Sequence, residues 1–458
     1  MRVAWMVVCL TAVCVGGAAC RPGPVETTAA SAPVADPGAE SCRYALAPLA
    51  GDGPFTTEVA AQQRRAADPR ADEAALEQLG YLFVARARLT HDDGLYTAAL
   101  ETASCLEGRH PANDQARLLR GHIRHQQHRF AEAEAIARPL VASRGLAMDF
   151  ALLGDALMEQ GRLSEAAAAY QRMIDLKPYY QSYTRAAHLR WLRGNLTGAI
   201  ELMRKAVASA SPRDPEAGAW ARTRLADYDL QAGRLDEART ECERVLAARP
   251  GYAPALLALG RVRLAQNQPL DAVAALRAAE AANPQPDVRW ALADALRATG
   301  RDGEAAPVER ALEREGGARD PRTLALYLST RGTAPGRAVD LARRELALRA
   351  DVFTEDALAW ALVRAGRVDE AAPHMARALA EGTRDGRLFL HGGLIAAAAG
   401  DRTRARALLG RARALAPTLL PSERALLAPP SGGREARDPH VRLAGDGLRR
   451  LQQERTGS

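Results

Sequence analysis

The amino-acid sequence predicts an all-α protein built as a solenoid of stacked helical hairpins. A unit of two short amphipathic helices recurs along the chain, and residues 150–178 show it most clearly, with a break at Gly161. A small residue at Gly154 facing a small residue at Ala166 predicts that the two helices approach closely. Alanine dominates the apolar residues, aromatic residues are 5% of the chain, and no strand-like alternation stands out. These observations favour stacked helices over a sandwich or an α/β sheet.

The turn between the two helices carries a recognisable motif. Gly161, Arg162 and Leu163 are followed by an acidic residue and an alanine, and Pro178 closes the unit. This pattern resembles the tetratricopeptide repeat, which has a period of about 34 residues. The resemblance implies a right-handed superhelix whose first helices line a concave groove, and in that family the groove holds a peptide or a partner helix.

Turn residues recur with this period along most of the chain. Neighbouring turns lie 33 to 39 residues apart, except for one gap of 66 residues that spans two periods. We place the degenerate turn in that gap near Pro335 and Gly336, and we expect about ten hairpins over residues 76–416. The predicted turn residues are Gly94, His128, Gly161, Gly194, Gly233, Asn267, Gly300, Gly366 and Gly400.

The first residues are expected to be a targeting segment rather than part of the fold. Residues 1–19 have a positive start, a short apolar run and a small-residue end before Cys20, which is typical of a signal peptide. The segment resembles a bacterial lipoprotein signal, and the resemblance implies lipidation of Cys20. Gly17 departs from the aliphatic residue of that signal, so ordinary cleavage near Ala19 or a retained anchor stays open. Residues 20–41 are expected to form a disordered tether.

Segments on either side of the repeats are expected to cover the open ends of the solenoid. Residues 42–75 are predicted to be an N-terminal cap, and residues 417–458 a C-terminal cap followed by a flexible Arg-rich tail. In an oxidising compartment we expect a disulfide between Cys42 and Cys105, with two free thiols as the alternative. Cys242 takes a second-helix position that predicts a buried, free thiol.

The charge and the motifs give no indication of nucleic-acid binding or catalysis. The net charge is +7, but acidic residues are interleaved with the arginines and no stripe of one sign forms, so no nucleic-acid partner is expected. No nucleophile elbow, phosphate loop or His-Glu-x-x-His motif occurs, and we expect no enzyme, no cofactor and no metal. The alternative is a metal-dependent module that uses His122, His125 and His128, because the first two share a helix face.

The implied groove can be mapped onto residues by counting from each turn. Large aromatic side chains in such a groove suit partner recognition. A register shift of one residue would instead place the tryptophans in the core. The candidate groove residues are Trp191, Trp220, Trp290, Trp360, Asp155, Asp227, Asp294, Arg261, Arg297 and Arg364.

Together these features predict a non-catalytic scaffold that binds a peptide or partner protein in its groove. The expected location is the periplasm or cell envelope of a bacterium, with a lipid anchor in the membrane. If the N-terminus is not processed, the alternative is a cytoplasmic adaptor of the same fold.

Overall fold

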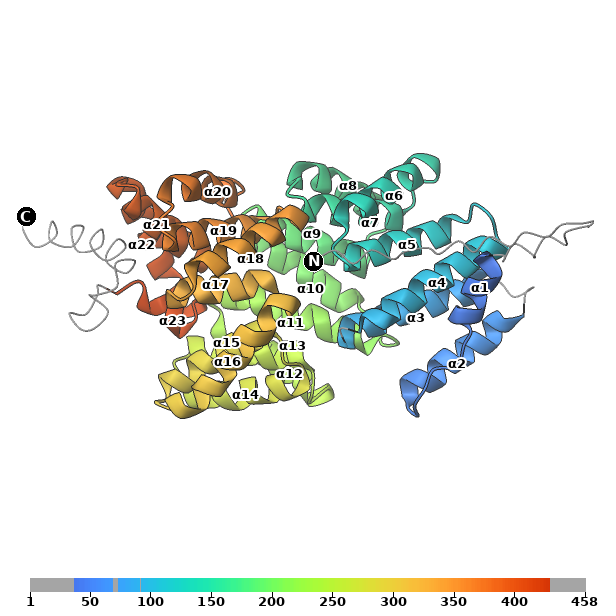
Figure 1. Cartoon of the computed structure of the whole chain (residues 1–458), viewed down its shortest axis with the longest axis horizontal. Helices are drawn as coiled ribbons and strands as arrows, with labels where there is room; N and C mark the ends of the chain where they lie inside the picture. Colours follow the sequence, from blue (N-terminus) through green and yellow to red (C-terminus); the bar gives the residue numbers. More distant parts are fainter. Residues whose placement is uncertain (1–36, 69–72, 91, 429–458) are drawn as a thin grey trace, which may run out of the picture.

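The computed structural model describes residues 37–68, 73–90 and 92–428, and this part of the chain contains helices but no strand (Figure 1). The predicted all-α solenoid is therefore confirmed. The predicted signal peptide, Cys20 and most of the predicted tether and tail lie outside the described residues. None of the described helices is both long enough and apolar enough to cross a membrane.

Ten hairpins form the body of the protein, in agreement with the predicted repeat number. They are α3 (Glu73–Thr90) with α4 (Asp93–Arg109), α5 (Asp114–Gln126) with α6 (Phe130–Ser143), α7 (Ala147–Glu159) with α8 (Leu163–Leu176), α9 (Tyr180–Leu192) with α10 (Leu196–Ser209), α11 (Pro215–Gln231) with α12 (Leu235–Ala248), α13 (Ala253–Ala265) with α14 (Pro269–Ala282), α15 (Pro286–Ala298) with α16 (Asp302–Arg319), α17 (Pro321–Arg331) with α18 (Pro335–Leu348), α19 (Val352–Arg364) with α20 (Val368–Ala380), and α21 (Gly386–Ala398) with α22 (Arg402–Ala414).

The turns inside the hairpins use the left-handed backbone region. Every predicted turn residue except Gly94 has a positive φ, including the non-glycine residues His128 and Asn267. Gly94 instead lies in the first turn of α4. The degenerate repeat turns at Gly332, with φ 71°, and not at Pro335 and Gly336 as predicted. The predicted position was wrong because Pro335 begins α18, where its missing N–H is not needed, so the proline marks the start of the helix and not the turn before it.

Close packing within a hairpin depends on glycine, but its partner differs from the one predicted. A Cβ atom at Gly154 would overlap the ring of Tyr170 on α8, rather than meet Ala166. Gly260 of α13 lies in the same way against Leu276 of α14. The absent side chain on the first helix therefore makes room for a large side chain on the second.

The N-terminal segment packs against the first hairpin through a disulfide. Cys42 of α1 (Pro37–Ala45) is bonded to Cys105 of α4, as the sequence predicted, while Cys242 is free and buried. Helix α2 (Pro54–Ala67) follows and packs on α3. Helix α1 begins at Pro37, so the last residues assigned to the disordered tether are helical. The contact with α4 gives these residues a packed partner, because Gly38 lies directly against Gly108.

The C-terminal end of the described chain returns to the middle of the solenoid. After α22 come the short 3-10 helix η1 (Ala416–Thr418) and α23 (Pro421–Ala425), which contact α13, α15 and α17. The Ser422 backbone N–H and hydroxyl both donate to Asp294 of α15, at 2.8 and 2.6 Å. The last helix therefore covers earlier hairpins, where the sequence predicted a cap on the end of the stack.

Gly154→Ala is expected to lower the free energy of unfolding by about 1–3 kcal/mol, because the added methyl group must displace the Tyr170 ring. Gly410→Ala is the matched control, since Gly410 lies within α22 and a Cβ there meets nothing within 4 Å. That control is expected to be neutral or to stabilise by up to about 1 kcal/mol. Urea unfolding measures both, and equal effects of the two variants would contradict the packing described for Gly154.

Candidate functional site

The concave side of the solenoid is partly closed by the chain itself. Two connections from late hairpins lie against the ends of early helices. The Ala350 N–H donates to the Glu159 carbonyl at 3.1 Å, and the Thr383 hydroxyl donates to the Leu192 carbonyl. An ion pair of 3.5 Å joins Arg193 to Glu381. We call this set of contacts the seam; it links the ends of α7 and α9 to the connections that precede α19 and α21.

Turn glycines allow the two sides of the seam to approach. Gly161 and Gly194 follow α7 and α9, with φ of 74° and 75°. A Cβ atom at Gly194 would lie 2.6 Å from the Gly382 carbonyl oxygen, and one at Gly161 would overlap the Ala350 carbonyl oxygen. The residues that close the hairpins therefore also permit closure of the superhelix.

One arginine organises the charge at the seam. The Arg349 guanidinium lies 2.8 Å from the Glu159 carboxylate, 3.2 Å from His128 Nε2 and 5.5 Å from the centre of the Phe130 ring. Burial raises the pKa of Glu159 to about 7, against the opposing effect of Arg349. Burial and Arg349 together lower the pKa of His128 to about 4. The imidazole is therefore neutral at pH 7 and lies beside the guanidinium without charge repulsion.

Three of the four predicted groove tryptophans are buried by the chain itself. Trp191 is 8% exposed and stacks on Phe353 of α19, with ring centres 5.3 Å apart. Trp290 is 2% exposed and donates to the Ser422 hydroxyl of α23. Trp360 is 1% exposed and stacks on His391. Trp191 is covered by α19 from a later hairpin, Trp290 by α23, and Trp360 by the hairpins on either side of its own.

Trp220 differs from the other three tryptophans. It is half-buried and packs against the main hydrophobic core. It therefore remains partly accessible, but it does not line any of the four best-defined cavities among the described residues.

Most of the predicted charged groove residues are held by partners within the protein. Buried Asp155 accepts from Arg185 and from the Tyr170 hydroxyl, each at 2.7 Å. Asp294 accepts a hydrogen bond from Ser422, and burial raises the pKa of Asp294 to about 6. Arg297 pairs with Glu309 at 2.5 Å, and buried Arg364 lies over the Trp360 ring. Asp227 and Arg261 line a central cavity together with Trp191.

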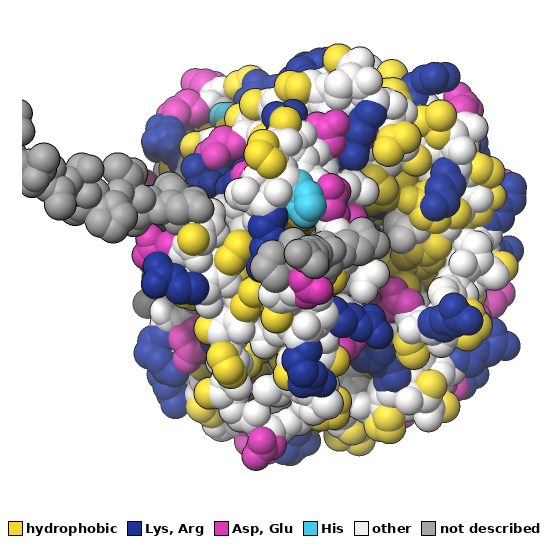
Figure 2. All heavy atoms as spheres, turned by 90° about the vertical axis from the view of Figure 1, so that its right-hand side faces the viewer, with side chains coloured by type: hydrophobic (Ala, Val, Ile, Leu, Met, Phe, Trp, Pro, Cys, Tyr) yellow, Lys and Arg dark blue, Asp and Glu magenta, His cyan; other side chains and the backbone are white. Residues whose placement is uncertain are grey.

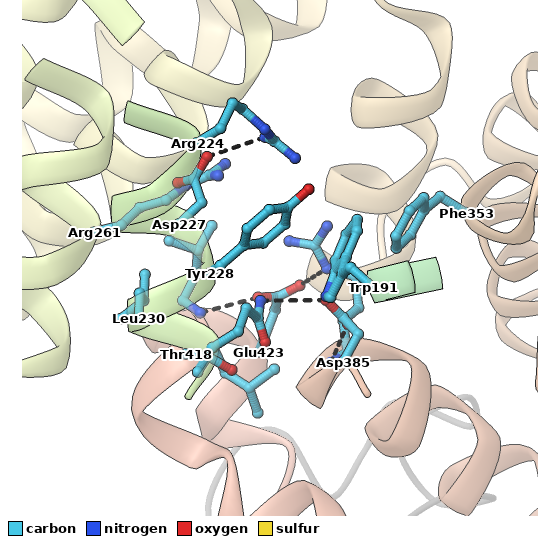
Figure 3. Close-up of a pocket in the computed structure, with 14 residues that line it drawn as sticks. Trp191, Arg224, Asp227, Tyr228, Leu230, Arg261, Phe353, Asp385, Thr418 and Glu423 are labelled. Carbon is cyan, nitrogen blue, oxygen red and sulfur yellow. Dashed lines mark hydrogen bonds and ion pairs between the residues drawn. The ribbon is translucent and has the colours of Figure 1, made fainter. Parts of the chain in front are cut away.

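The central cavity lies between the two halves of the superhelix and has a volume of about 200 Å³ (Figure 3). Helices α9, α11 and α13 supply one wall, and α19, the start of α21 and the chain from η1 to α23 supply the other. Arg224 pairs with Asp227 at 3.0 Å, and Arg387 pairs with Glu423. The cavity is the part of the predicted concave groove that the returning hairpins leave unfilled.

A second, open part of the concave side lies at the N-terminal end. Two adjoining cavities of about 610 and 490 Å³ share Glu77 and Tyr81 of α3. We call this region the N-terminal groove. It runs from α2 across the starts of α3, α5 and α7 to the start of α9. Figure 2 faces this end of the molecule and shows a hollow with hydrophobic atoms on its floor and both basic and acidic side chains around it.

The N-terminal groove exposes apolar side chains on a fixed frame. Leu146 and Leu176, 52% and 49% exposed, are two of the few large apolar side chains that the described chain leaves open to solvent. Both line this groove, together with Met148 and Tyr179. The buried Asp149 carboxylate accepts from the Leu146 N–H and pairs with Arg144, which fixes the loop before α7. The groove is therefore preformed.

The histidines considered as metal ligands do not form a metal site in the described chain. His122 and His125 are buried, and burial lowers their pKa values, to about 4 for His122. His128 lies at the seam, away from ligand geometry. No group of three or more potential ligands comes together among the described residues.

Two of these histidines have a second feature in common. His122 Nε2 and His125 Nε2 have no hydrogen-bond partner among the residues that the structure describes. His122 lies edge-on to Tyr81 of the N-terminal groove, with ring centres 6.0 Å apart, and His125 lies edge-on to Phe130. Neutral aromatic packing is thus the role that their surroundings support.

The repeats also match a known family. A sequence profile of the tetratricopeptide repeat matches residues 151–218, 184–253 and 257–320. The chain therefore contains tetratricopeptide repeats, as the turn motif indicated. No curated protein matches the sequence.

Several solved structures are similar to parts of this chain at low sequence identity. The crystal structure of PilW, described as a widely conserved type IV pilus biogenesis factor, has 17% identity and a TM-score of 0.39, covering 44% of this chain and 94% of that one. A thermophilic TPR protein of Thermus thermophilus has 20% identity and a TM-score of 0.35, covering 45% and 100%. PilF of Pseudomonas aeruginosa has 16% identity and a TM-score of 0.30, covering 60% and 95%.

The pH dependence of the seam can be tested at Glu159. Its pKa is near 7 in the folded protein and near 4.5 when unfolded, so the folded state holds the proton more tightly between these values. The wild-type free energy of unfolding should therefore fall relative to that of Glu159→Gln as the pH rises from 5 to 8, by about 1–3 kcal/mol. Chemical denaturation at each pH gives the difference.

Glu165→Gln, on exposed α8 of the same hairpin, is the control for this titration, because hydrogen bonds from Arg162 lower the pKa of Glu165. The wild-type free energy of unfolding should not fall relative to that of Glu165→Gln as the pH rises. Parallel pH profiles of the wild type and Glu159→Gln would contradict the assignment.

Proposed function

We propose that this protein is a non-catalytic scaffold that binds a segment of a partner protein in its N-terminal groove. The observation that carries the proposal is the location of exposed Leu146 and Leu176 in one preformed hollow of a helical-repeat protein. Tetratricopeptide repeats act in general as protein interaction modules, and apolar anchors in a polar rim are typical of interface centres.

The chemistry of the groove defines the partner segment. Leu146, Leu176 and Met148 favour apolar side chains on the segment, because their burial would remove exposed apolar area from water. Glu77 and Lys177 on the rim favour flanking charges of both signs rather than a highly charged ligand. An amphipathic segment with apolar anchors meets both conditions.

We further propose that the protein is exported and anchored through Cys20 in the bacterial cell envelope. The support is the signal-like composition of residues 1–19 and the disulfide between Cys42 and Cys105, since disulfides persist in oxidising compartments. Scaffolding would then concern envelope assemblies. A cytoplasmic adaptor is the outcome that an unprocessed N-terminus would support.

Groove binding can be tested by photocrosslinking in the native host. A photoreactive residue at Gln115 in the groove is expected to give a defined partner adduct, and Leu146→Glu should weaken that adduct about tenfold or more, because a charge would be buried against the apolar segment. The matched control is Leu270→Glu on α14, since Leu270 is 68% exposed and outside the groove.

Loss of the adduct in both glutamate variants, or in neither, would count against the groove. Circular dichroism of each variant checks that the helices are retained.

The anchor can be tested by the intact mass of protein recovered from membranes of its host. We expect cleavage before Cys20 and a mass increase from acyl chains, with Cys20→Ser abolishing both. A chain that begins at Met1 and stays in the soluble fraction would overturn the anchor without affecting the groove.

A further inference from the structure

The sequence after the last described helix contains an apolar and basic stretch that the scaffold function leaves unused. Residues 440–455 read HVRLAGDGLRRLQQER and lie outside the described part of the chain. We call this stretch the tail segment. It contains four arginines and two acidic residues, and its large apolar residues are Val441, Leu443, Leu448 and Leu451. The tail segment therefore has the amphipathic composition that the N-terminal groove favours.

The two ends of the N-terminal groove differ in charge. At the α2–α3 end, the carboxylates of Glu58 and Glu77 line the cavity, and none of the described residues that line this end is basic. At the α9 end, the Lys177 ammonium lies 4.6 Å from the centre of the Tyr179 ring. A segment with arginines therefore finds complementary charge toward α2 and α3.

The apolar floor of the groove suits leucine side chains. Leu146 and Leu176 are about half exposed on this floor, and Met148 lies beside them. Leu448 and Leu451 are three residues apart, so a helical turn would place both on one face. Their burial against the floor would remove apolar area from water on both surfaces. Arginines next to them in the sequence would then reach the acidic end of the groove.

The position at which the described chain ends favours a groove in another copy. Ala428 follows α23, which contacts α13, α15 and α17. Figure 1 shows α23 and the helices α2 and α3 toward opposite ends of the long axis. Residues 429–440 span at most about 45 Å when fully extended. Within one copy, this short connection would have to pass the hairpins that the seam joins, whereas a neighbouring copy can present its groove directly.

We propose that the tail segment of one copy binds in the N-terminal groove of a second copy. The contact is heterologous, because each copy offers its groove to one neighbour and its tail segment to another. Copies can therefore associate head to tail, and an occupied groove is closed to other partners. This inference rests on the groove of the proposed function and adds a second copy of the chain as an occupant.

Self-association can be measured by sedimentation velocity of the full-length, disulfide-bonded protein, with Cys20→Ser in every sample so that no acyl chain contributes. We expect the average mass to rise with protein concentration and the association to weaken with added salt. Leu448→Glu should weaken association about tenfold or more, because a charge would be buried on the apolar floor. Ala436→Glu is the matched control, since it makes the same change of charge before the tail segment and should leave association unchanged.

The groove side of the contact has its own pair of variants. Leu146→Glu should weaken self-association about tenfold or more, and Leu270→Glu, which is exposed outside the groove, should not. Circular dichroism checks that each variant keeps its helices.

A mixture of two proteins tests whether the contact joins different copies. One protein carries a photoreactive residue at Gln115 together with Leu448→Glu, and the other has the unchanged groove and tail segment. We expect a covalent dimer after illumination, with the adduct on residues 440–455 of the second protein. Ala436→Glu in the second protein should leave this dimer unchanged, and Leu448→Glu there should remove it.

Three results would overturn the proposal. The first is wild-type protein that stays monomeric at all concentrations. The second is equal association of the Leu448→Glu and Ala436→Glu variants. The third is an adduct of Gln115 with the tail segment of its own chain and no covalent dimer, which would assign the tail segment to its own groove. If a different host protein still forms the Gln115 adduct in any of these cases, the proposed scaffold function stands without self-association.

Discussion

The left-handed residue between the two helices of each hairpin is the constraint on which the structure depends. A positive φ reverses the chain within a few residues, so the second helix must return along the first. Because almost every hairpin uses the same turn, each hairpin meets the next in a similar way and the curvature accumulates. The accumulated curvature brings the connection at Ala350 back to the end of α7 and the connection at Thr383 back to the end of α9.

Internal ion pairs involve many of the arginines in the sequence. Arginines hold acidic residues between neighbouring hairpins, as Arg185 does with Asp155 at 2.7 Å, and within a hairpin, as Arg297 does with Glu309. Largely buried pairs of this kind contribute little net stability because desolvation offsets their attraction, but an unpaired partner would be costly. Some of the arginines therefore hold one hairpin against another. On the face in Figure 2, basic and acidic side chains are mixed and form no surface of a single sign.

The sequence predicted the local features of the fold more fully than the candidate sites. Turn spacing gave the hairpins because φ at His128 or Asn267 is a local property of the chain. The disulfide was also predictable, since Cys42 and Cys105 were the two cysteines left near the open end of the first hairpin. By contrast, burial of Trp191 and Trp290 depends on Phe353 and Ser422, which lie far away in sequence.

The seam explains why several of the predicted groove residues are covered by the chain itself. Position within a repeat determines which side chains face the concave side, but superhelix curvature determines what else reaches that side. Phe353 and Ser422 carry no signal that they pack on Trp191 and Trp290. Leu146 lies in the connection before α7 and Leu176 is the last residue of α8, and neither is a groove position in the repeat numbering. A leucine in or beside a connection, where a polar residue is usual, is the sequence signal for the N-terminal groove.

Closure of the superhelix also restricts how the gene can change. An open array of repeats can gain or lose a unit, because each unit contacts only its neighbours. Here Gly161 contacts Ala350 and Gly194 contacts Gly382, so the number of units between the two residues of each pair is fixed. Duplication or deletion of one hairpin in this interval would carry the later connections past their partners, so the contacts of the seam require a fixed number of repeats.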